Sequence, residues 1–292
     1  MKPPIFIIGN PRSGTTLLRL MVASHPGIVV PPECGFLIWW REKYGDWKSA
    51  DADGVRLEEF LRDLAASKKI ETWALDYAAL AAAIRAVRPA NYAALGSLVY
   101  AAFAKQHKPE FQRWGDKNNF HVKHVATLHA LLPDACFVHI IRDGRDVACS
   151  YRQLARAKIQ SAYAPKLPVD IAAIAEEWRT NLETVRRDFA ALPAAQKHEL
   201  RYEDLVREPE ATLRGLCAAI GETFDPLMLE YHQLNRRDKM EPGEFLQWKA
   251  KTLEAPDASD LGKFRTELPP EDIAAFGKIA GDLLRAYRYD CP

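Results

Sequence analysis

The sequence predicts an α/β fold in which helices flank a parallel sheet, and two patterns favour it. A short apolar strand at residues 5–8 runs directly into a glycine-containing loop and an apolar helix. A second apolar run, residues 136–141, is followed by a polar turn and another helical segment. Apolar runs of this length are typical of strands buried on both faces of a parallel sheet, and their alternation with helices indicates an α/β architecture.

The same alternation continues along the chain. The predicted strands cover residues 5–8, 136–141 and 198–202, and the predicted helices cover 16–24, 147–158, 171–192, 209–220 and 271–287. In the segment 171–192 apolar side chains recur at spacings of three and four, a stripe that core packing explains. Asp143 or Asp146 can cap the helix that follows the second apolar strand.

Composition and charge narrow the class of protein. A chain of 292 residues with 48% hydrophobic residues can bury one large core, with two small cores as the alternative. The formal net charge is +1, from 40 basic and 39 acidic residues, so no global field favours a nucleic acid or a membrane surface as partner. Any anion site must therefore be local. The five cysteines are scattered and lack CxxC spacing, which argues against a disulfide framework and a zinc site.

The ends of the chain and its apolar runs bear on localisation. The N-terminal stretch MKPPIFIIGNPRSG lacks the long apolar core of a secretory signal, and no apolar run approaches the ~20 residues of a membrane span. We therefore expect a soluble, cytoplasmic protein without a membrane partner. A homodimer is among the assemblies that the sequence allows.

The loop after the first strand has nearly the form of an ATP-binding phosphate loop. It lies in the stretch FIIGNPRSGTTLLRLM, residues 6–21. Gly9 and Gly14 let the backbone turn so that the N–H groups of Ser13, Gly14, Thr15 and Thr16 are expected to point inward. The positive end of the following helix adds to this nest, which predicts a site for a tetrahedral anion.

The loop lacks the lysine that ATP-binding loops use to neutralise the β and γ phosphates. Thr15 stands at that position, and the remaining cation is Arg12, inside the loop. The ligand should then carry less charge than a triphosphate and need no metal. A phosphosulfate fits, because a sulfuryl group bears one negative charge where a terminal phosphoryl group bears two. An ordinary strand–loop–helix junction with incidental glycines stays an alternative.

Two motifs together resemble one enzyme family. PRSGTTLL resembles the 5′-phosphosulfate loop of sulfotransferases that use 3′-phosphoadenosine 5′-phosphosulfate (PAPS). In the second unit, Arg142 and Ser150 match the arginine and serine, eight residues apart, that contact the 3′-phosphate in that family. An arginine fork suits two phosphate oxygens, although Arg142 could instead pair with Asp143 or Asp146. The resemblance implies a P-loop NTPase-like three-layer fold with a central parallel sheet of about five strands and a helical cap.

Three further residues are cofactor-binding candidates through the same resemblance. Tyr202 in RYEDLV looks like the family tyrosine near the adenine, although a tyrosine at a strand end is also common in cores. Lys263 and Arg265 in GKFR resemble a late basic segment that folds over the 3′-phosphate.

The catalytic residues resemble those of one branch of the family. The cytosolic branch has a lysine followed two residues later by a histidine base, but here Lys117 is followed by Asn119, whose amide cannot take a proton. In tyrosylprotein sulfotransferases a glutamate 21 residues after the loop arginine is the base, and 21 residues after Arg12 stands Glu33. The resemblance implies that Glu33 is the base and that Arg12 and Lys117 stabilise developing charge. A helix cap or an ordinary salt bridge is the alternative role of Glu33.

We expect one sulfotransferase domain over residues 1–292, with two special segments. Residues 34–115 contain five of the seven tryptophans and predict a cap with an apolar acceptor pocket, although aromatic residues also fill ordinary cores. Residues 242–263 are irregular and polar and predict a mobile flap.

Transfer of the sulfuryl group from PAPS to a hydroxyl of a small molecule or peptide is the expected function, giving a sulfate ester and 3′,5′-adenosine bisphosphate. A P-loop kinase or nucleotide hydrolase is the first alternative, which Thr15 and the strand ending in Arg142 oppose. A non-catalytic nucleotide-binding module is the second, and it would need neither Glu33 nor Lys117. His121, His124 and His129 lack a carboxylate to complete a metal site and are expected at a helix surface or core edge, and His139 in the core.

Overall fold

A five-stranded parallel sheet forms the centre of the computed structural model, which describes residues 1–157 and 159–290. The predicted helix end at 158 and Cys291 lie outside these residues. The strand order is β2-β3-β1-β4-β5 and every neighbouring pair is parallel. The strands are β1 (Ile5–Ile8), β2 (Ile28–Val29), β3 (Arg113–Lys117), β4 (Cys136–Ile141) and β5 (Lys197–Arg201). The predicted parallel α/β fold is confirmed.

Helices surround the sheet and include all five that were predicted. They are α1 (Thr15–Ala23), α2 (Phe36–Trp39), α3 (Arg41–Tyr44), α4 (Val55–Ala65), α5 (Tyr77–Val87), α6 (Tyr92–His107), α7 (Val125–Leu131), α8 (Gly144–Arg156), α9 (Ile171–Ala190), α10 (Tyr202–Arg207), α11 (Pro209–Ala219), α12 (Tyr231–Asp238), α13 (Leu246–Lys249), α14 (Phe264–Glu267) and α15 (Pro270–Ala286). Helix α8 starts at Gly144 because the Asp143 carboxylate accepts the Arg145 N–H at 2.9 Å, so Asp143 is the cap.

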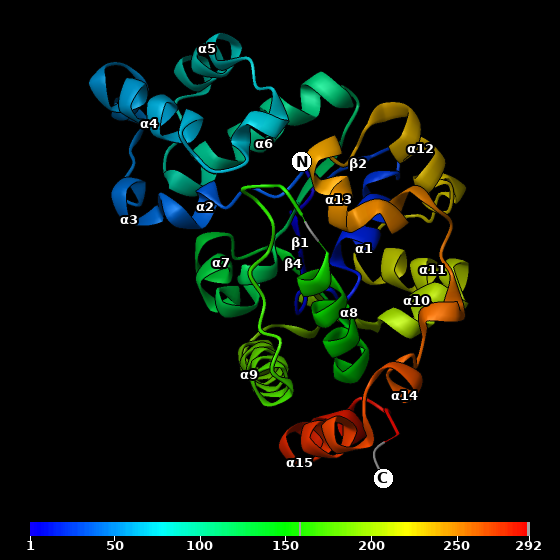
Figure 1. Ribbon diagram of the computed structural model, residues 1–292. Helices are drawn as coiled ribbons and strands as arrows, with labels where there is room; N and C mark the ends of the chain where they lie inside the picture. The colour runs from blue at the N-terminus through cyan, green and yellow to red at the C-terminus, as the bar shows by residue number, and fades with distance from the viewer. Residues whose placement is uncertain (158, 291–292) are drawn as a thin grey trace.

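Alternating side chains of β1 divide the core into two layers. Ile5 and Ile7 pack into a cluster that includes Leu18 of α1 and Leu213 of α11. Phe6 and Ile8 belong to a cluster on the opposite face, together with residues of α6, α7 and α9. Since neighbouring residues of a strand point to opposite faces, helices cover both sides of the sheet. This is the expected three-layer arrangement (Figure 1).

The strands β2 and β3 were not predicted, and their sequences explain why. Strand β2 has only two residues, Ile28 and Val29. Strand β3 reads RWGDK, and its polar residues Arg113, Asp116 and Lys117 are all buried. A strand with buried charged residues lacks the apolar pattern that identifies a buried strand from sequence.

The region predicted to be a cap forms helices α2–α6, which gather on one side of the sheet (Figure 1), and its role as an acceptor-site cap stays a prediction. Its aromatic residues mostly fill its own core: Trp47, Trp73 and Trp114 are buried, and Trp114 stacks on Tyr100 with ring centroids 4.0 Å apart. None of the five tryptophans of this region lines the main cavity, which Trp248 lines instead. Trp47, Trp73 and Trp114 therefore form a core, whereas Trp39 is 43% exposed. An apolar acceptor pocket in this region stays a prediction.

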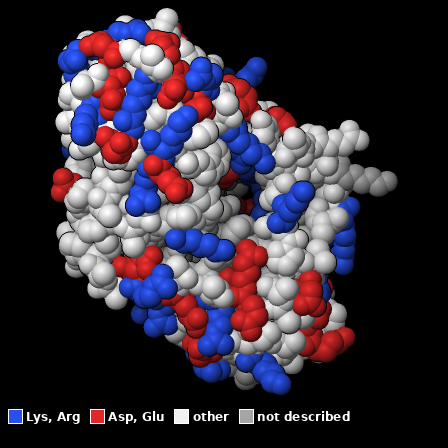
Figure 2. Space-filling view, turned by 90° about the vertical axis from the view of Figure 1, so that its left-hand side faces the viewer, with Lys and Arg blue, Asp and Glu red and all other residues white. Residues whose placement is uncertain are grey.

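Acidic and basic side chains are interspersed on the molecular face shown in Figure 2, around a central hollow. This mixture agrees with a net charge near zero. Among residues 1–157 and 159–290, no helix combines the length and apolar character that crossing a membrane requires.

Lys108, just after α6, holds the loop between α1 and β2. Its ammonium group donates to the carbonyl oxygens of Ala23, His25 and Ile28 at 2.9, 2.6 and 2.8 Å. Burial lowers the pKa of Lys108 to about 8. We expect Lys108→Met to lower the free energy of unfolding by ~2 kcal/mol, because three carbonyls lose a charged donor.

Urea unfolding of the two proteins measures this difference. Lys105→Met is the matched control, because Lys105 is exposed on the same helix, and a change within about 0.5 kcal/mol is expected. Equal losses in the two variants would contradict the role of Lys108.

Candidate active site

A cavity of about 370 Å³ lies at the carboxyl ends of the strands. One candidate residue lies at or after the carboxyl end of each strand: in sheet order from β2 to β5, these are Glu33, Lys117, Arg12, Arg142 and Tyr202. Four of the five line the cavity, and buried Lys117 contacts it through Glu33. The sheet thus brings together residues that are up to 190 positions apart in the chain (Tyr202 minus Arg12).

The loop after β1 leaves three of the four predicted backbone donors for an anion. The first hydrogen bond of α1 runs from the Leu18 N–H to the Gly14 carbonyl at 3.0 Å, so the N–H groups of Gly14, Thr15 and Thr16 precede the helical bonding pattern. Gly14 is required here, because its φ is +88° and a Cβ would lie 2.3 Å from the Tyr202 ring.

Ser13 differs from its predicted role. Its N–H donates to the Asn10 carbonyl at 3.2 Å and so does not point into the nest. Its hydroxyl is buried and has no hydrogen-bond partner among the described residues. The loop tightens at Asn10–Ser13, which removes this one donor from the four expected.

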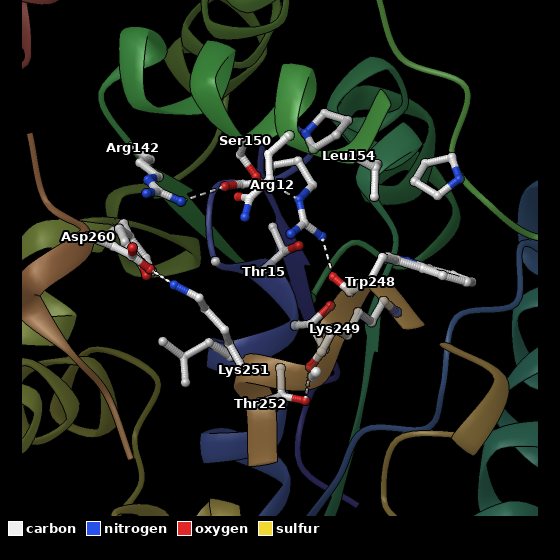
Figure 3. A pocket seen from close by; sticks show the side chains of 18 of the residues that line it. Arg12, Thr15, Arg142, Ser150, Leu154, Trp248, Lys249, Lys251, Thr252 and Asp260 are labelled. Atoms are coloured by element: carbon white, nitrogen blue, oxygen red, sulfur yellow. Dashed lines mark hydrogen bonds and ion pairs between the residues drawn. The ribbon is translucent and has the colours of Figure 1, made fainter. Parts of the chain in front are cut away.

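Arg12 and Arg142 place two guanidinium groups beside the loop (Figure 3). The Arg12 Nε donates to the Ser150 hydroxyl and its Nη1 to the Trp248 carbonyl, both at 3.0 Å. Arg142 donates to the Arg12 carbonyl at 3.2 Å and stacks on the Tyr202 ring, 4.4 Å from its centroid. Burial, and then the charge of Arg142, lowers the pKa of Arg12.

No carboxylate of the described residues forms a salt bridge with Arg12 or Arg142. Asp143 pairs with Arg145 at 2.7 Å, and Asp146 accepts the N–H groups of Gly262 and Phe264. The alternative that Arg142 pairs with Asp143 or Asp146 is therefore wrong. Two neighbouring arginines without a counter-ion favour an anionic ligand.

Thr15, at the position of the missing lysine, forms a hydrogen bond with Asn119. The Thr15 hydroxyl donates to the Asn119 side-chain oxygen at 2.9 Å. Thr15 stands where ATP-binding loops have lysine, and Asn119 stands where a histidine base was considered. The two substituted positions hydrogen-bond to each other, and both line the cavity.

Glu33 is surrounded by ammonium groups. Lys117 makes a very short contact with its Oε1, Lys69 donates to its Oε2 at 2.7 Å, and Lys249 lies 3.9 Å from Oε1. Burial alone would raise the pKa of Glu33, but the charges of Lys117, Lys249 and Lys69 hold it well below the usual value. Glu33 is therefore ionised at neutral pH and caps no helix.

Lys117 connects the carboxylate to the phosphate loop. Its Nζ also donates to the Thr16 hydroxyl at 3.0 Å, and its side chain is 1% exposed. Burial lowers the pKa of Lys117 to about 8, although the charge of Glu33 opposes this shift. The lysine thus stays mostly protonated at neutral pH, near a value at which it can lose its proton.

Four charged residues of the site were not predicted: Arg19, Lys69, Glu241 and Lys249. Glu241 pairs with both Arg19 and Lys249 at 2.5 Å and is only 2% exposed. Lys249 and Glu241 come from the chain after α12, and Lys69 from the cap. Their positions depend on contacts between distant segments, and no local sequence pattern marks them.

The segment 242–263 folds over the phosphate loop. It contains α13 and three short 3₁₀ helices, Gly243–Phe245, Ala250–Leu253 and Ala258–Asp260. Its Trp248 carbonyl accepts from Arg12, and Lys263 lines the cavity beside Arg142. Arg265 lies outside the cavity lining and pairs with Asp290 at 3.2 Å. Mobility of this flap stays a prediction.

The histidines take no part in a metal cluster among the described residues. His121 is completely buried, so its expected place at a surface or core edge is wrong. It packs near Asp116, whose pKa burial raises to about 7. His139 is buried in β4, as predicted, with its Nδ1 2.9 Å from the Glu199 carboxylate.

Comparison with known proteins identifies the family. Residues 3–226 match the sulfotransferase family. Protein-tyrosine sulfotransferase A of Caenorhabditis elegans is 23% identical over 81% of this chain and 54% of its own length. The nodulation protein NoeE of Sinorhizobium fredii (strain NBRC 101917 / NGR234) is 25% identical over 98% of this chain and 65% of its own length. The chain thus spans between about half and two thirds of these relatives.

Solved structures share the whole fold. The sulfotransferase domain from the curacin biosynthetic pathway superposes with a TM-score of 0.65 at 20% identity, covering 100% of this chain and 99% of that one. The sulfotransferase domain of the Synechococcus PCC 7002 olefin synthase gives a TM-score of 0.65 at 25% identity, covering 100% and 98%. With the family match over most of its length, this chain belongs to the sulfotransferase family.

Proposed function

We propose that this protein transfers the sulfuryl group of PAPS to a hydroxyl group of a small molecule or peptide. The observation that carries the proposal is the order of residues along the sheet edge. At one side Glu33 follows β2 and Lys117 ends β3, and at the other side Arg142 and Tyr202 follow β4 and β5. The loop containing Arg12 lies between them, so the acceptor and nucleotide sides meet at the phosphate nest.

The residues on the nucleotide side suit the two anionic ends of PAPS. Arg142, which has no carboxylate partner in the described chain, together with Ser150 and Lys263, would hold the 3′-phosphate. The N–H groups of Gly14, Thr15 and Thr16 would hold the 5′-phosphosulfate. The Tyr202 ring, stacked on Arg142, would lie near the adenine. PAPS supplies an activated sulfuryl group to this site.

Glu33 is the base that takes the proton of the acceptor hydroxyl. The acceptor oxygen forms a bond to sulfur while the bond from sulfur to the phosphate oxygen breaks, and the hydroxyl proton passes to the Glu33 carboxylate. Lys117, with contacts to Glu33 and Thr16, stabilises negative charge on the transferred group and the leaving phosphate. Arg12 adds a second cation from the loop. The products are a sulfate ester and 3′,5′-adenosine bisphosphate.

Transfer of radiolabelled sulfur from PAPS tests this function. Labelled PAPS is incubated with phenols, aliphatic alcohols, sugars and tyrosine peptides, and both the labelled ester and the bisphosphate are measured. Equal amounts of ester and bisphosphate are expected with at least one acceptor class. Bisphosphate binding without transfer to any acceptor would instead favour a non-catalytic nucleotide-binding module.

The pKa of Lys117 predicts how activity depends on pH. The protonated lysine is the form that stabilises negative charge, so kcat/KM, which reports the free enzyme, should fall as pH rises through about 8. In Lys117→Arg the guanidinium stays charged over this pH range, so the fall of kcat/KM should move to roughly pH 10 or above. A limb that stays near pH 8 in Lys117→Arg would show that another group titrates. Lys105→Arg, at an exposed position of α6, is the control and should leave the limb unchanged.

A further inference from the structure

Lys69 is a cation of the cavity that the proposed transfer step does not use. It precedes the 3₁₀ helix Ile70–Trp73 of the cap and lines the cavity. Its side chain is 18% exposed, and its Nζ donates to the Glu33 Oε2 at 2.7 Å. Glu33 is its one salt-bridge partner among the described residues.

The other two lysines around Glu33 have further partners. Lys117 also donates to the Thr16 hydroxyl at 3.0 Å, on the phosphate loop. Lys249, in the segment 242–263 that folds over that loop, pairs with Glu241 at 2.5 Å. Lys69 alone comes from the cap, and it is the most exposed of the three lysines: its side chain is 18% exposed, against 1% for Lys117 and 8% for Lys249. It is therefore the lysine around Glu33 that an anion entering the cavity can reach most readily.

The reaction itself would remove that charge. When Glu33 takes the proton of the acceptor hydroxyl, its carboxyl group becomes neutral. Lys69 then keeps its positive charge in a largely buried place without a counter-ion, which is unfavourable. A negative charge arriving with the acceptor would restore the balance.

The ammonium group of Lys69 is also positioned before any ligand binds. Its backbone is left-handed, with φ 74°, and its carbonyl accepts the Thr72 hydroxyl at 2.7 Å. The Nζ lies 5.2 Å from the centre of the Phe245 ring, which itself packs edge-on against Tyr163. A cation held in this way needs little reordering to bind an anion.

Building on the proposed function, we propose that Lys69 binds an anionic group, a carboxylate or a phosphate, carried by the acceptor itself. The anion would lie within roughly 8 Å of the hydroxyl that is sulfated, the sum of three hydrogen-bond lengths through Glu33 and Lys69. Lys69 is then a specificity-determining residue, and the substrate class is a hydroxy acid or a hydroxyalkyl phosphate. Neutral alcohols of the same shape bind less well.

Calorimetric titration with matched compounds tests this proposal. The carboxylate pair is 3-hydroxybenzoate and 3-hydroxybenzamide, and the phosphate pair is glycerol 3-phosphate and glycerol. The titrations use the parent protein and Glu33→Gln, whose neutral amide resembles the protonated carboxyl group. Each is run with and without 3′,5′-adenosine bisphosphate, so that a failure of nucleotide binding is recorded separately from a failure of Lys69.

In Glu33→Gln we expect the anionic member of one pair to bind about tenfold more tightly than its neutral partner, and more selectively than in the parent. Adding Lys69→Met should reduce this preference to less than about twofold. Adding Lys68→Met should preserve this preference. Lys68 is exposed, lies over the Tyr163 ring and is not one of the residues that line the cavity. Equal binding within both pairs, or a preference that survives Lys69→Met, would overturn the proposal. The pair that shows the preference distinguishes a carboxylate from a phosphate.

Discussion

Glu33→Gln is expected to lower the rate of sulfuryl transfer about 1000-fold while 3′,5′-adenosine bisphosphate still binds within about threefold of the parent affinity. The amide has the same shape as the carboxylate but cannot take the acceptor proton. The nucleotide contacts assigned to Arg142 and Ser150 lie on the other side of the sheet edge and remain. Single-turnover transfer from labelled PAPS measures the rate, and calorimetry measures the affinity.

The variant must be compared with a change that also removes a nearby negative charge. Glu71→Gln serves this purpose, because Glu71 is exposed at the same edge of the cap and hydrogen-bonds Tyr163 at 2.5 Å. It should retain transfer within about threefold. Loss of a counter-ion for Lys117 and Lys69 will also destabilise Glu33→Gln, so rates are compared below its unfolding transition. A fully active Glu33→Gln protein would refute Glu33 as the base.

Arg142→Ala is expected to weaken binding of 3′,5′-adenosine bisphosphate about 30-fold, or ~2 kcal/mol. Arg142 has no carboxylate partner in the described chain and presents its guanidinium beside the phosphate loop. Its loss removes charge-assisted hydrogen bonds to the 3′-phosphate. Calorimetric titration measures the affinity, and Arg236→Ala, an exposed arginine of α12, is the control that should stay within about twofold.

The ligand provides a second control for Arg142. Adenosine 5′-monophosphate lacks the 3′-phosphate, so its weaker binding should be nearly the same in the parent and in Arg142→Ala. Arg142 also donates to the Arg12 carbonyl and stacks on Tyr202, and a merely structural role would weaken both nucleotides equally. An equal loss for the two nucleotides would contradict direct recognition of the 3′-phosphate.

The sequence was most informative where function constrains a short continuous segment. The apolar strand, the two glycines and Arg12 in FIIGNPRSGTTLLRLM identified the strand, the loop and the helix that follow one another in the structure. The alternative pairings of Arg142 could not be decided from spacing alone. The backbone N–H groups of Gly262 and Phe264, from a distant part of the chain, donate to the Asp146 carboxylate. This contact keeps Asp146 from pairing with Arg142, and no local spacing predicts it.

Two other features were beyond the sequence for physical reasons. Strand β3 buries two charged residues, each with a partner from elsewhere in the chain: Lys117 contacts Glu33 in the site, and Asp116 accepts the Tyr100 hydroxyl of the cap. The apolar pattern of a buried strand is therefore absent. The lysines Lys69 and Lys249 reach Glu33 only through the packing of the cap and the flap. Neither has a neighbouring motif that would indicate such a contact.

The central claim is that the loop binds the adenosine bisphosphate of a sulfuryl donor and not a triphosphate. Parallel calorimetric titrations with 3′,5′-adenosine bisphosphate and with ATP plus magnesium test it most directly. The bisphosphate should bind at least about tenfold more tightly, for two reasons. Thr15 stands in place of the lysine that would neutralise a triphosphate, and Arg142 lines the cavity where the 3′-phosphate is expected to bind. Tighter binding of ATP with magnesium would contradict the account and favour a P-loop kinase or nucleotide hydrolase.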